Sequence, residues 1–155
     1  MTFAAQIAAF EKKTNAELER IAHGAMKIMH LGLVETSPLG EENSGSYEDY
    51  KPGTFQNNWT VTMGSPATGL DFEEADKGAA HANALYDISA LKTTEMWYVT
   101  NNTPYGPAIE FEQWSGKRFP HTRKGVIRPL VLAGGWQNIV NEAQRTASES
   151  DEVPF

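Results

Sequence analysis

Apolar residues recur at three- and four-residue spacing through the first part of the chain. From residue 2 to about residue 33 they make one stripe, which consists of Phe3, Ile7, Phe10, Leu18, Ile21, Ala25, Ile28 and Met29. On a helix this spacing gathers the stripe on one face, while the charged residues from Glu11 to Arg20 fall mainly elsewhere. The pattern predicts a long amphipathic helix. Gly24 and Gly32 each weaken it by about 1 kcal/mol relative to Ala, so we expect it to end near Gly32.

Two later segments have the composition of strands. Residues 58–63 (NWTVTM) alternate polar and apolar side chains, and residues 95–101 (EMWYVTN) are rich in aromatic and β-branched side chains. We expect them to pair as an antiparallel sheet. Residues 35–56 are interrupted by Pro and Gly and predict a long loop of the kind that is often functional. Between the strands, the alanine-rich residues 71–91 predict a second helix or a helical insertion.

Two further helices are expected after the second strand. Asn102 and Pro104 favour a turn, and Pro104 suits the first position of a helix. The apolar residues that follow fall at helical spacing; they are Tyr105, Ala108, Ile109, Phe111 and Trp114. A last helix is expected over residues 126–146, with a bend at Gly134 and Gly135. Its buried side is expected to consist of Ile127, Leu130, Val131, Trp136, Ile139 and Val140.

The order of these elements predicts an α+β fold in a single domain over residues 1–155. In this fold a small antiparallel sheet packs with the long N-terminal helix and the C-terminal helix. A chain of 155 residues is long enough to bury a core without disulfides. We expect the four tryptophans to build that core; they are Trp59, Trp97, Trp114 and Trp136.

Three short strings resemble motifs of one protein family. Asn102, Tyr105, Ala108, Glu110 and Phe111 resemble the N-x-x-Y-A-x-x-x-E-F-G core of the tail-component family of long, non-contractile-tailed phages, with Glu112 in place of its last Gly. Residues 52–61 (PGTFQNNWTV), which include Trp59, resemble that family's T-G-x-L-R-x-S-W opening of its first strand. Arg128 and Pro129 resemble the R-P-F-L-x-x-A start of its closing helix.

The resemblance implies a structural virion protein and no enzymatic activity. Members of the family act as neck, tail-completion or minor tail proteins at the head-to-tail junction. It therefore implies a homo-oligomeric ring, six- or twelve-fold, around the DNA channel. Expected neighbours are tail-tube, tail-terminator or head-connector proteins, and DNA would pass through the lumen without sequence-specific binding. A tail terminator that caps the tail tube is the alternative within this class. A small adaptor or a hydrolase with an unrecognised site is the alternative outside it.

Charge is distributed unevenly along the chain. The formal net charge of −7 argues against a general nucleic-acid binder, because affinity for phosphate depends on clustered Lys and Arg. Residues 113–141 nevertheless contain no acidic side chain. Within them, residues 115–125 (SGKRFPHTRKG) predict either a solvated basic loop or an interface arm that contacts an acidic protein surface or, less favoured, DNA. The candidate interface residues are Lys117, Arg118, Phe119, Arg123 and Lys124.

Glu110 is a further candidate for an interface or a structural contact. It follows the turn at Asn102 and Pro104, where a carboxylate can accept hydrogen bonds from backbone N–H groups or from an Arg and hold the turn in place. An Arg of a neighbouring chain would be a suitable partner. Because Glu110 and Glu112 are two positions apart on a helix, they point in different directions and do not predict a catalytic carboxylate pair.

Residue types exclude several kinds of chemistry. The chain has no cysteine, so disulfides, thiolate catalysis and cysteine-based zinc sites are excluded. Its four histidines, His23, His30, His81 and His121, lack the spacing of a zinc helix, and we expect them on the surface or partly packed. No glycine-rich phosphate loop occurs either. We therefore predict no catalytic, cofactor-binding or metal-binding residue.

Apolar runs in this sequence are short. None approaches the roughly 20 residues that span a bilayer, and the first residues lack the basic leader of a secretory signal. We therefore expect no contact with a membrane. The expected locations are the host cytoplasm during assembly and then the neck or tail of the virion.

Overall fold

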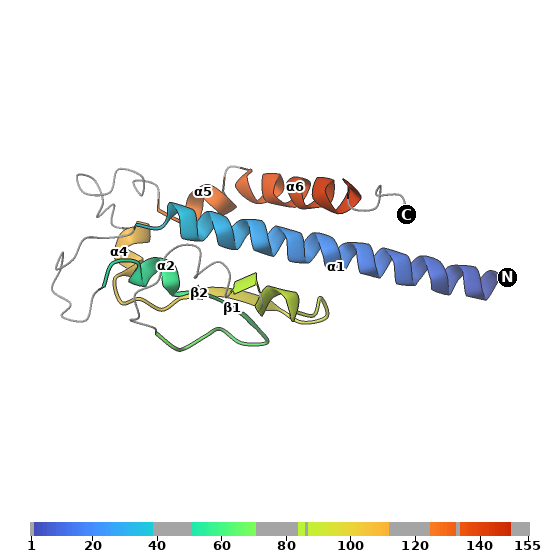
Figure 1. Cartoon of the computed structure of the whole chain (residues 1–155), viewed down its shortest axis with the longest axis horizontal. Helices are drawn as coiled ribbons and strands as arrows, with labels where there is room; N and C mark the ends of the chain where they lie inside the picture. Colours follow the sequence, from blue (N-terminus) through green and yellow to red (C-terminus); the bar gives the residue numbers. More distant parts are fainter. Residues whose placement is uncertain are drawn as a thin grey trace.

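The computed structural model describes residues 2–38, 51–70, 84–85, 87–111, 125–132 and 134–149. These residues form the expected α+β fold, in which a long N-terminal helix lies between a two-stranded antiparallel sheet and a C-terminal helical segment (Figure 1). The elements are α1 (Phe3–Thr36), α2 (Thr54–Asn57), β1 (Trp59–Met63), β2 (Trp97–Asn101), α4 (Gly106–Phe111), α5 (Arg128–Val131) and α6 (Gly135–Glu149).

Helix α1 is the central element and is 34 residues long. Thr2 caps its start, because the Thr2 hydroxyl accepts a hydrogen bond from the N–H of Ala5 at 3.3 Å. The helix passes through Gly32 and ends at Thr36, and the backbone N–H of the C-cap residue Ser37 donates to the carbonyl of Leu33. The expectation that α1 ends near Gly32 is therefore wrong.

The two glycines of α1 are explained by close packing against the C-terminal helices. A β-carbon at Gly24 would lie 3.3 Å from the β-carbon of Ala143, and one at Gly32 would lie 2.9 Å from a methyl group of Leu130. α6 and α5 therefore approach the α1 backbone at these positions, and α6 runs antiparallel to α1. The packing offsets the low helix propensity of glycine.

We expect a larger side chain at Gly24 to displace α6. Gly24→Leu should lower the free energy of unfolding by about 1–3 kcal/mol, because it overpacks the contact with Ala143. Chemical denaturation followed by circular dichroism measures this change. The matched control is Ala16→Leu, which adds the same side chain at an exposed position of the same helix and should change stability little. Equal effects of the two substitutions would contradict the role assigned to Gly24.

Strands β1 and β2 confirm the predicted antiparallel pair. Trp59 lies opposite Asn101, Val61 opposite Val99, and Met63 opposite Trp97, so these side chains share one face of the sheet. That face packs against Met26 and Met29 of α1. The opposite face carries threonines, and the hydroxyls of Thr60 and Thr100 lie 2.9 Å apart across the strands.

The C-terminal segment forms two helices, α5 and α6, and not the single bent helix expected over residues 126–146, although the break lies where the bend was expected. Gly134 adopts a left-handed conformation (φ 84°) between α5 and α6. This turn interrupts the helical period, so residues before and after it do not share one buried side. Ile139 is buried, whereas Ile127, Val131 and Trp136, all expected on the buried side, are exposed.

Several smaller expectations are corrected as well. α4 begins at Gly106 and not at Pro104, because the turn at Asn101 and Thr103 extends two residues further. The two ends of the expected loop 35–56 are helical, since they belong to α1 and α2. Of the expected helix 71–91, residues 84–85 and 87–89 are helical and the remainder lies largely outside the described residues. Trp114 also lies outside them.

The core surrounds the C-terminal half of α1. One buried cluster joins this half to α2, β1 and α4 and consists of Leu33, Val34, Phe55, Trp59, Tyr105, Ile109 and Val126. A second lies between α1 and the sheet and a third between α1 and α6. Within the described parts of the chain, no helix combines the length and the apolar character needed to cross a bilayer.

Candidate functional site

The carboxylate of Glu110 organises the start of α5. One of its oxygens accepts hydrogen bonds from the N–H groups of Val126 at 2.7 Å and Ile127 at 3.0 Å, and the other accepts from the N–H of Arg128 at 3.3 Å. These N–H groups have no partner within α5, because Val126 and Ile127 precede the helix and Arg128 is its first residue. Glu110 of α4 therefore acts as a remote N-terminal cap for α5.

Two neighbours of Glu110 allow it to occupy this position: Gly125, which has no side chain, and the positively charged Arg128. Gly125 has a φ of 78°, and a β-carbon there would lie 2.5 Å from a carboxylate oxygen of Glu110. The guanidinium of Arg128 lies 3.5 Å from the same carboxylate and 5.0 Å from the ring centre of Phe111. The structure thus uses Glu110 inside its own chain, with Arg128 in the position that we considered for an Arg of a neighbouring chain.

Buried hydrogen bonds hold Trp59 in place. Its indole N–H donates to the hydroxyl of Ser37 at 2.7 Å, and Ser37 donates to the carbonyl of Leu33 at 2.6 Å. Nε2 of His30 lies 3.0 Å from the carbonyl of Trp59 and must be the donor, because a carbonyl can only accept. His30 is fully buried, whereas we expected the histidines on the surface or partly packed.

Trp97 is held in a similar way from the other strand. Its indole N–H donates to the carbonyl of Lys92 at 2.7 Å. The ring of His23 stacks on it, with centroids 5.3 Å apart and planes 13° apart, while Nε2 of His23 donates to the carbonyl of Leu91 at 2.9 Å. Hydrogen bonds therefore fix the positions of both tryptophan rings.

These anchored tryptophans form part of an apolar groove beside α1. The groove has a volume of about 360 Å³ and is lined by Met26, Met29, Leu33, Trp59, Trp97, Val99, Ile127, Val131 and Trp136. α1 forms the floor, because it lies between the sheet, which forms one wall, and α5 with the start of α6, which form the other. None of these lining residues is charged. Glu110, by capping α5, positions the wall that carries Ile127 and Val131.

A smaller hollow of about 200 Å³ continues the groove toward α4. The two hollows share Trp59, Val99 and Ile127. Glu110 and Phe111 line the far part of the smaller one. The apolar surface therefore extends from Trp136 to Phe111, and Phe111 itself is exposed.

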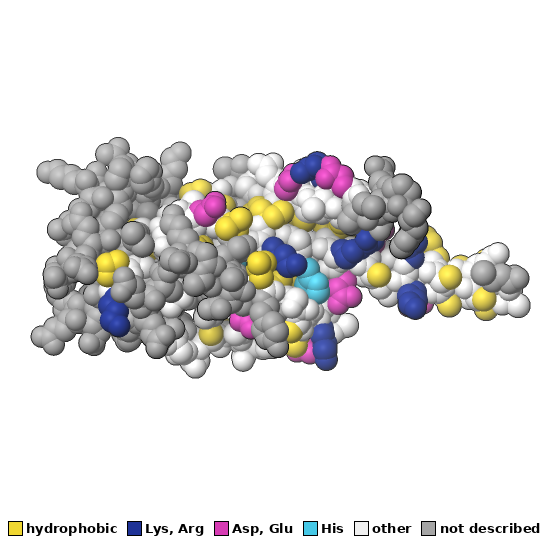
Figure 2. Space-filling view, viewed as in Figure 1, with side chains coloured by type: hydrophobic (Ala, Val, Ile, Leu, Met, Phe, Trp, Pro, Cys, Tyr) yellow, Lys and Arg dark blue, Asp and Glu magenta, His cyan; other side chains and the backbone are white. Residues whose placement is uncertain are grey.

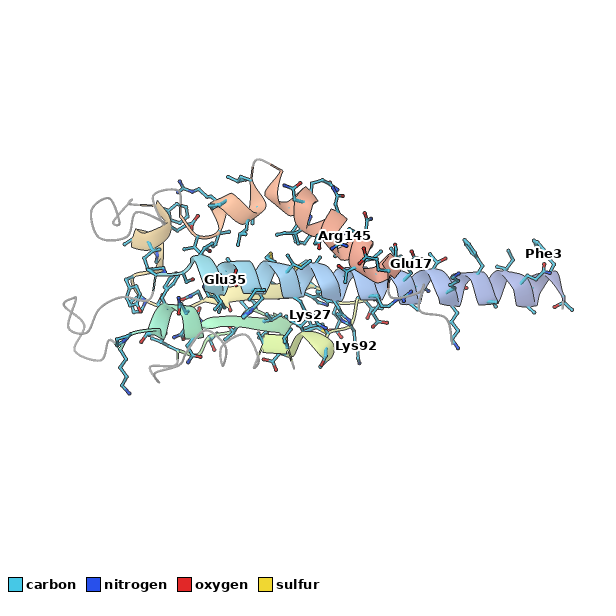
Figure 3. All side chains as sticks on the ribbon, turned by 45° about the horizontal axis from the view of Figure 1, so that its top comes forward. Phe3, Glu17, Lys27, Glu35, Lys92 and Arg145 are labelled. Carbon is cyan, nitrogen blue, oxygen red and sulfur yellow. The ribbon has the colours of Figure 1, made fainter. Side chains whose placement is uncertain are left out.

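The N-terminal half of α1 carries a second apolar surface, which we call the projecting face and define as Phe3, Ile7, Phe10 and Leu18. Figure 3 shows that, of the helices and strands that the structure describes, α1 alone extends from Glu17, near the end of α6, to Phe3 at its free end. Phe3 is 77% exposed and Phe10 is 71% exposed. Hydrophobic side chains are visible along this end of the helix in Figure 2. Among the described residues, the apolar stripe of α1 is therefore covered only in its C-terminal half.

The described residues offer little for catalysis or metal binding. Among them, no cluster of three His, Cys, Asp or Glu side chains is placed to hold a metal ion. The one charged side chain that lines the two hollows is Glu110, and its oxygens are occupied by backbone N–H groups. What the arrangement offers is an apolar, preformed surface suited to binding another protein.

Most of the residues predicted as an interface lie outside the described residues; these are Lys117, Arg118, Phe119, Arg123 and Lys124. The motif residues, in contrast, are all described. Tyr105 and Trp59 both pack around Phe55, and Phe111 contacts Arg128. Asn102 donates to the carbonyls of Ala67 and Gly69, and Pro129 lies in the first turn of α5.

The groove and the projecting face were not predicted from the sequence. A pattern that pointed to the projecting face was present, because residues 2–10 (TFAAQIAAF) contain no charge around the whole circumference of the helix. A helix that is apolar on all sides is normally covered.

Scans against protein-family models, curated proteins and solved structures find no match to this chain.

Proposed function

We propose that this chain is a non-enzymatic assembly subunit, and specifically a neck or tail-completion protein that forms a homo-oligomeric ring around the DNA channel of a long, non-contractile-tailed phage. The observation that carries the assembly role is the uncovered apolar surface at two separate places. The projecting face and the groove both expose large side chains that a lone soluble chain normally covers. Such surfaces are typical of subunits that function only within an assembly.

The position of the proposed subunit at the head-to-tail junction is supported by the resemblance of its motifs to the phage tail-component family. The three resembling segments lie far apart in the sequence, yet their side chains meet in one region around Glu110. Glu110 and Phe111 contact Arg128, and Phe55 contacts both Trp59 and Tyr105. Residues with a shared structural role are expected to converge in this way.

The mechanism of such a subunit is geometric. α1 serves as a rigid strut, the sheet and α4 to α6 form a body at one of its ends, and the uncovered apolar surfaces join neighbouring copies. A net charge of −7 suits a ring that DNA must pass through, because an acidic surface does not retain the phosphate backbone.

The expected result in solution is a closed oligomer. Multi-angle light scattering of the purified protein, alone and mixed with tail-tube or connector proteins, should give a mass six or twelve times that of the 17.1 kDa chain. A ring that binds only the free ends of tail tubes would indicate the tail-terminator alternative. A chain that stays monomeric alone and with each of these partners would overturn the proposal.

A further inference from the structure

We infer that the projecting face of one copy binds in the groove of the next copy. This inference rests on the proposed function, for which it supplies the contact between neighbouring subunits. The occupant is thus a second copy of this chain, in the form of an apolar helix. Phe3, Ile7 and Phe10 are the anchoring side chains, and Val131 and Trp136 lie at the exposed wall of the groove.

The spacing of the anchors fits a helix that binds in a groove. Phe3, Ile7 and Phe10 occupy positions i, i+4 and i+7, which is the spacing by which amphipathic helices insert side chains into apolar grooves. Ile7 is 51% exposed, so all three side chains remain available. The small alanines between them, at positions 4, 5, 8 and 9, let the helix approach a surface closely.

The groove complements this helix in charge and in size. Neither residues 2–10 nor the residues that line the 360 Å³ groove carry a charge, so neither surface would leave an unpaired charge buried. A hollow of this volume is in the range that accepts large apolar groups. Since hydrogen bonds and stacking already fix Trp59 and Trp97, little side-chain freedom is lost on binding.

A single chain cannot make this contact with itself. Phe3 and the groove residue Met26 belong to one continuous helix and are 23 residues apart (26 − 3), which corresponds to about 35 Å along its axis. Each copy therefore presents the helix at one end and the groove toward the other. Contacts of this head-to-tail kind generate closed rings or open filaments, whereas a self-complementary patch generates a two-fold dimer.

Cysteine cross-linking tests the contact directly, because the native chain contains no cysteine. Under mild oxidation, Ile7→Cys protein mixed with affinity-tagged Val131→Cys protein should form a disulfide-linked mixed dimer. The matched control is Ala5→Cys, which lies in the same exposed segment on the opposite side of the helix and should cross-link far less. Preferential cross-linking of Ile7→Cys to itself would overturn the inference in favour of paired projecting faces. Equal yields from Ile7→Cys and Ala5→Cys would also overturn it.

Self-association provides the second measurement. Phe10→Asp should weaken it by about 30-fold or more, as expected for the loss of a hot-spot aromatic, without lowering the melting temperature, because Phe10 is exposed. Ala5→Asp, the charge-matched control, should leave the association unchanged. If the wild-type ring forms and Phe10→Asp assembles equally well, the inference fails and the proposed ring stands. If the wild-type chain stays monomeric with every partner, the proposed function fails as well.

Discussion

Replacing Trp59 with Ala is expected to lower the free energy of unfolding by about 3–5 kcal/mol. Trp59 is 6% exposed and lies in the cluster that joins α1 to α2, β1 and α4. Its ring packs edge-on against Phe55, with centroids 5.6 Å apart, and its indole N–H donates to Ser37. Truncation to Ala would leave a cavity. It would also remove the indole N–H that donates to the buried hydroxyl of Ser37. Urea denaturation followed by circular dichroism measures the loss.

Trp136 provides a matched control for this prediction. It is 44% exposed at the wall of the groove, so Trp136→Ala should lower the stability of the chain by less than about 1 kcal/mol. Trp59→Phe keeps most of the ring volume and removes only the hydrogen bond, so its cost should fall between the two. A loss for Trp59→Ala no larger than that for Trp136→Ala would show that Trp59 does not have the core role assigned to it.

Glu110→Ala should destabilise the chain by about 3 kcal/mol. The substitution removes the acceptor for three backbone N–H groups at the start of α5, one of which, on Val126, is deeply buried. It also leaves Arg128 without its carboxylate. Glu110→Gln keeps one neutral acceptor and should cost less. The difference in unfolding free energy between the two variants measures how much of the effect comes from the charge.

The control for Glu110 is a carboxylate that also pairs with an Arg but lies in solvent. Glu142 on α6 accepts hydrogen bonds from Arg145, which lower the pKa of Glu142. Because solvent screens this pair, Glu142→Gln should leave the stability nearly unchanged. If both substitutions had equal effects, the capping role of Glu110 would be wrong.

Because Glu110 also positions Ile127 and Val131, its loss should weaken self-association too.

Periodicity predicted the elements of the candidate site better than it predicted which of them are covered. The strands and the long helix were identified correctly, because alternation and helical spacing are local properties of the chain. The C-terminal segment was predicted as one helix with a bend at Gly134 and Gly135, because glycines in a helical pattern mark a weak point but do not reveal the left-handed conformation of Gly134 that separates α5 from α6. Ile127, Val131 and Trp136 were consequently assigned to the core, although they form an exposed wall.

The role of Glu110 was only partly predictable. The sequence placed a carboxylate after a turn and suggested backbone or Arg partners, but its partners are 16 to 18 residues further along the chain. No local pattern identifies such a contact. Gly125 does not predict this contact from the sequence either. Its missing β-carbon nevertheless allows Glu110 to reach the start of α5.

By itself, the sequence determined the α+β class, the antiparallel strand pair and the absence of cysteine chemistry. These follow from residue types and short-range spacing, which act before the chain folds. Only the tertiary structure decided which part of the apolar stripe of α1 is covered. α6 packs along α1 through Gly24 and Ala143 and ends near Glu17, so the stripe remains open from Leu18 to Phe3. Which part of a helix is buried depends on where the other elements end in space. The spacing of apolar residues within one helix does not encode the positions of those ends.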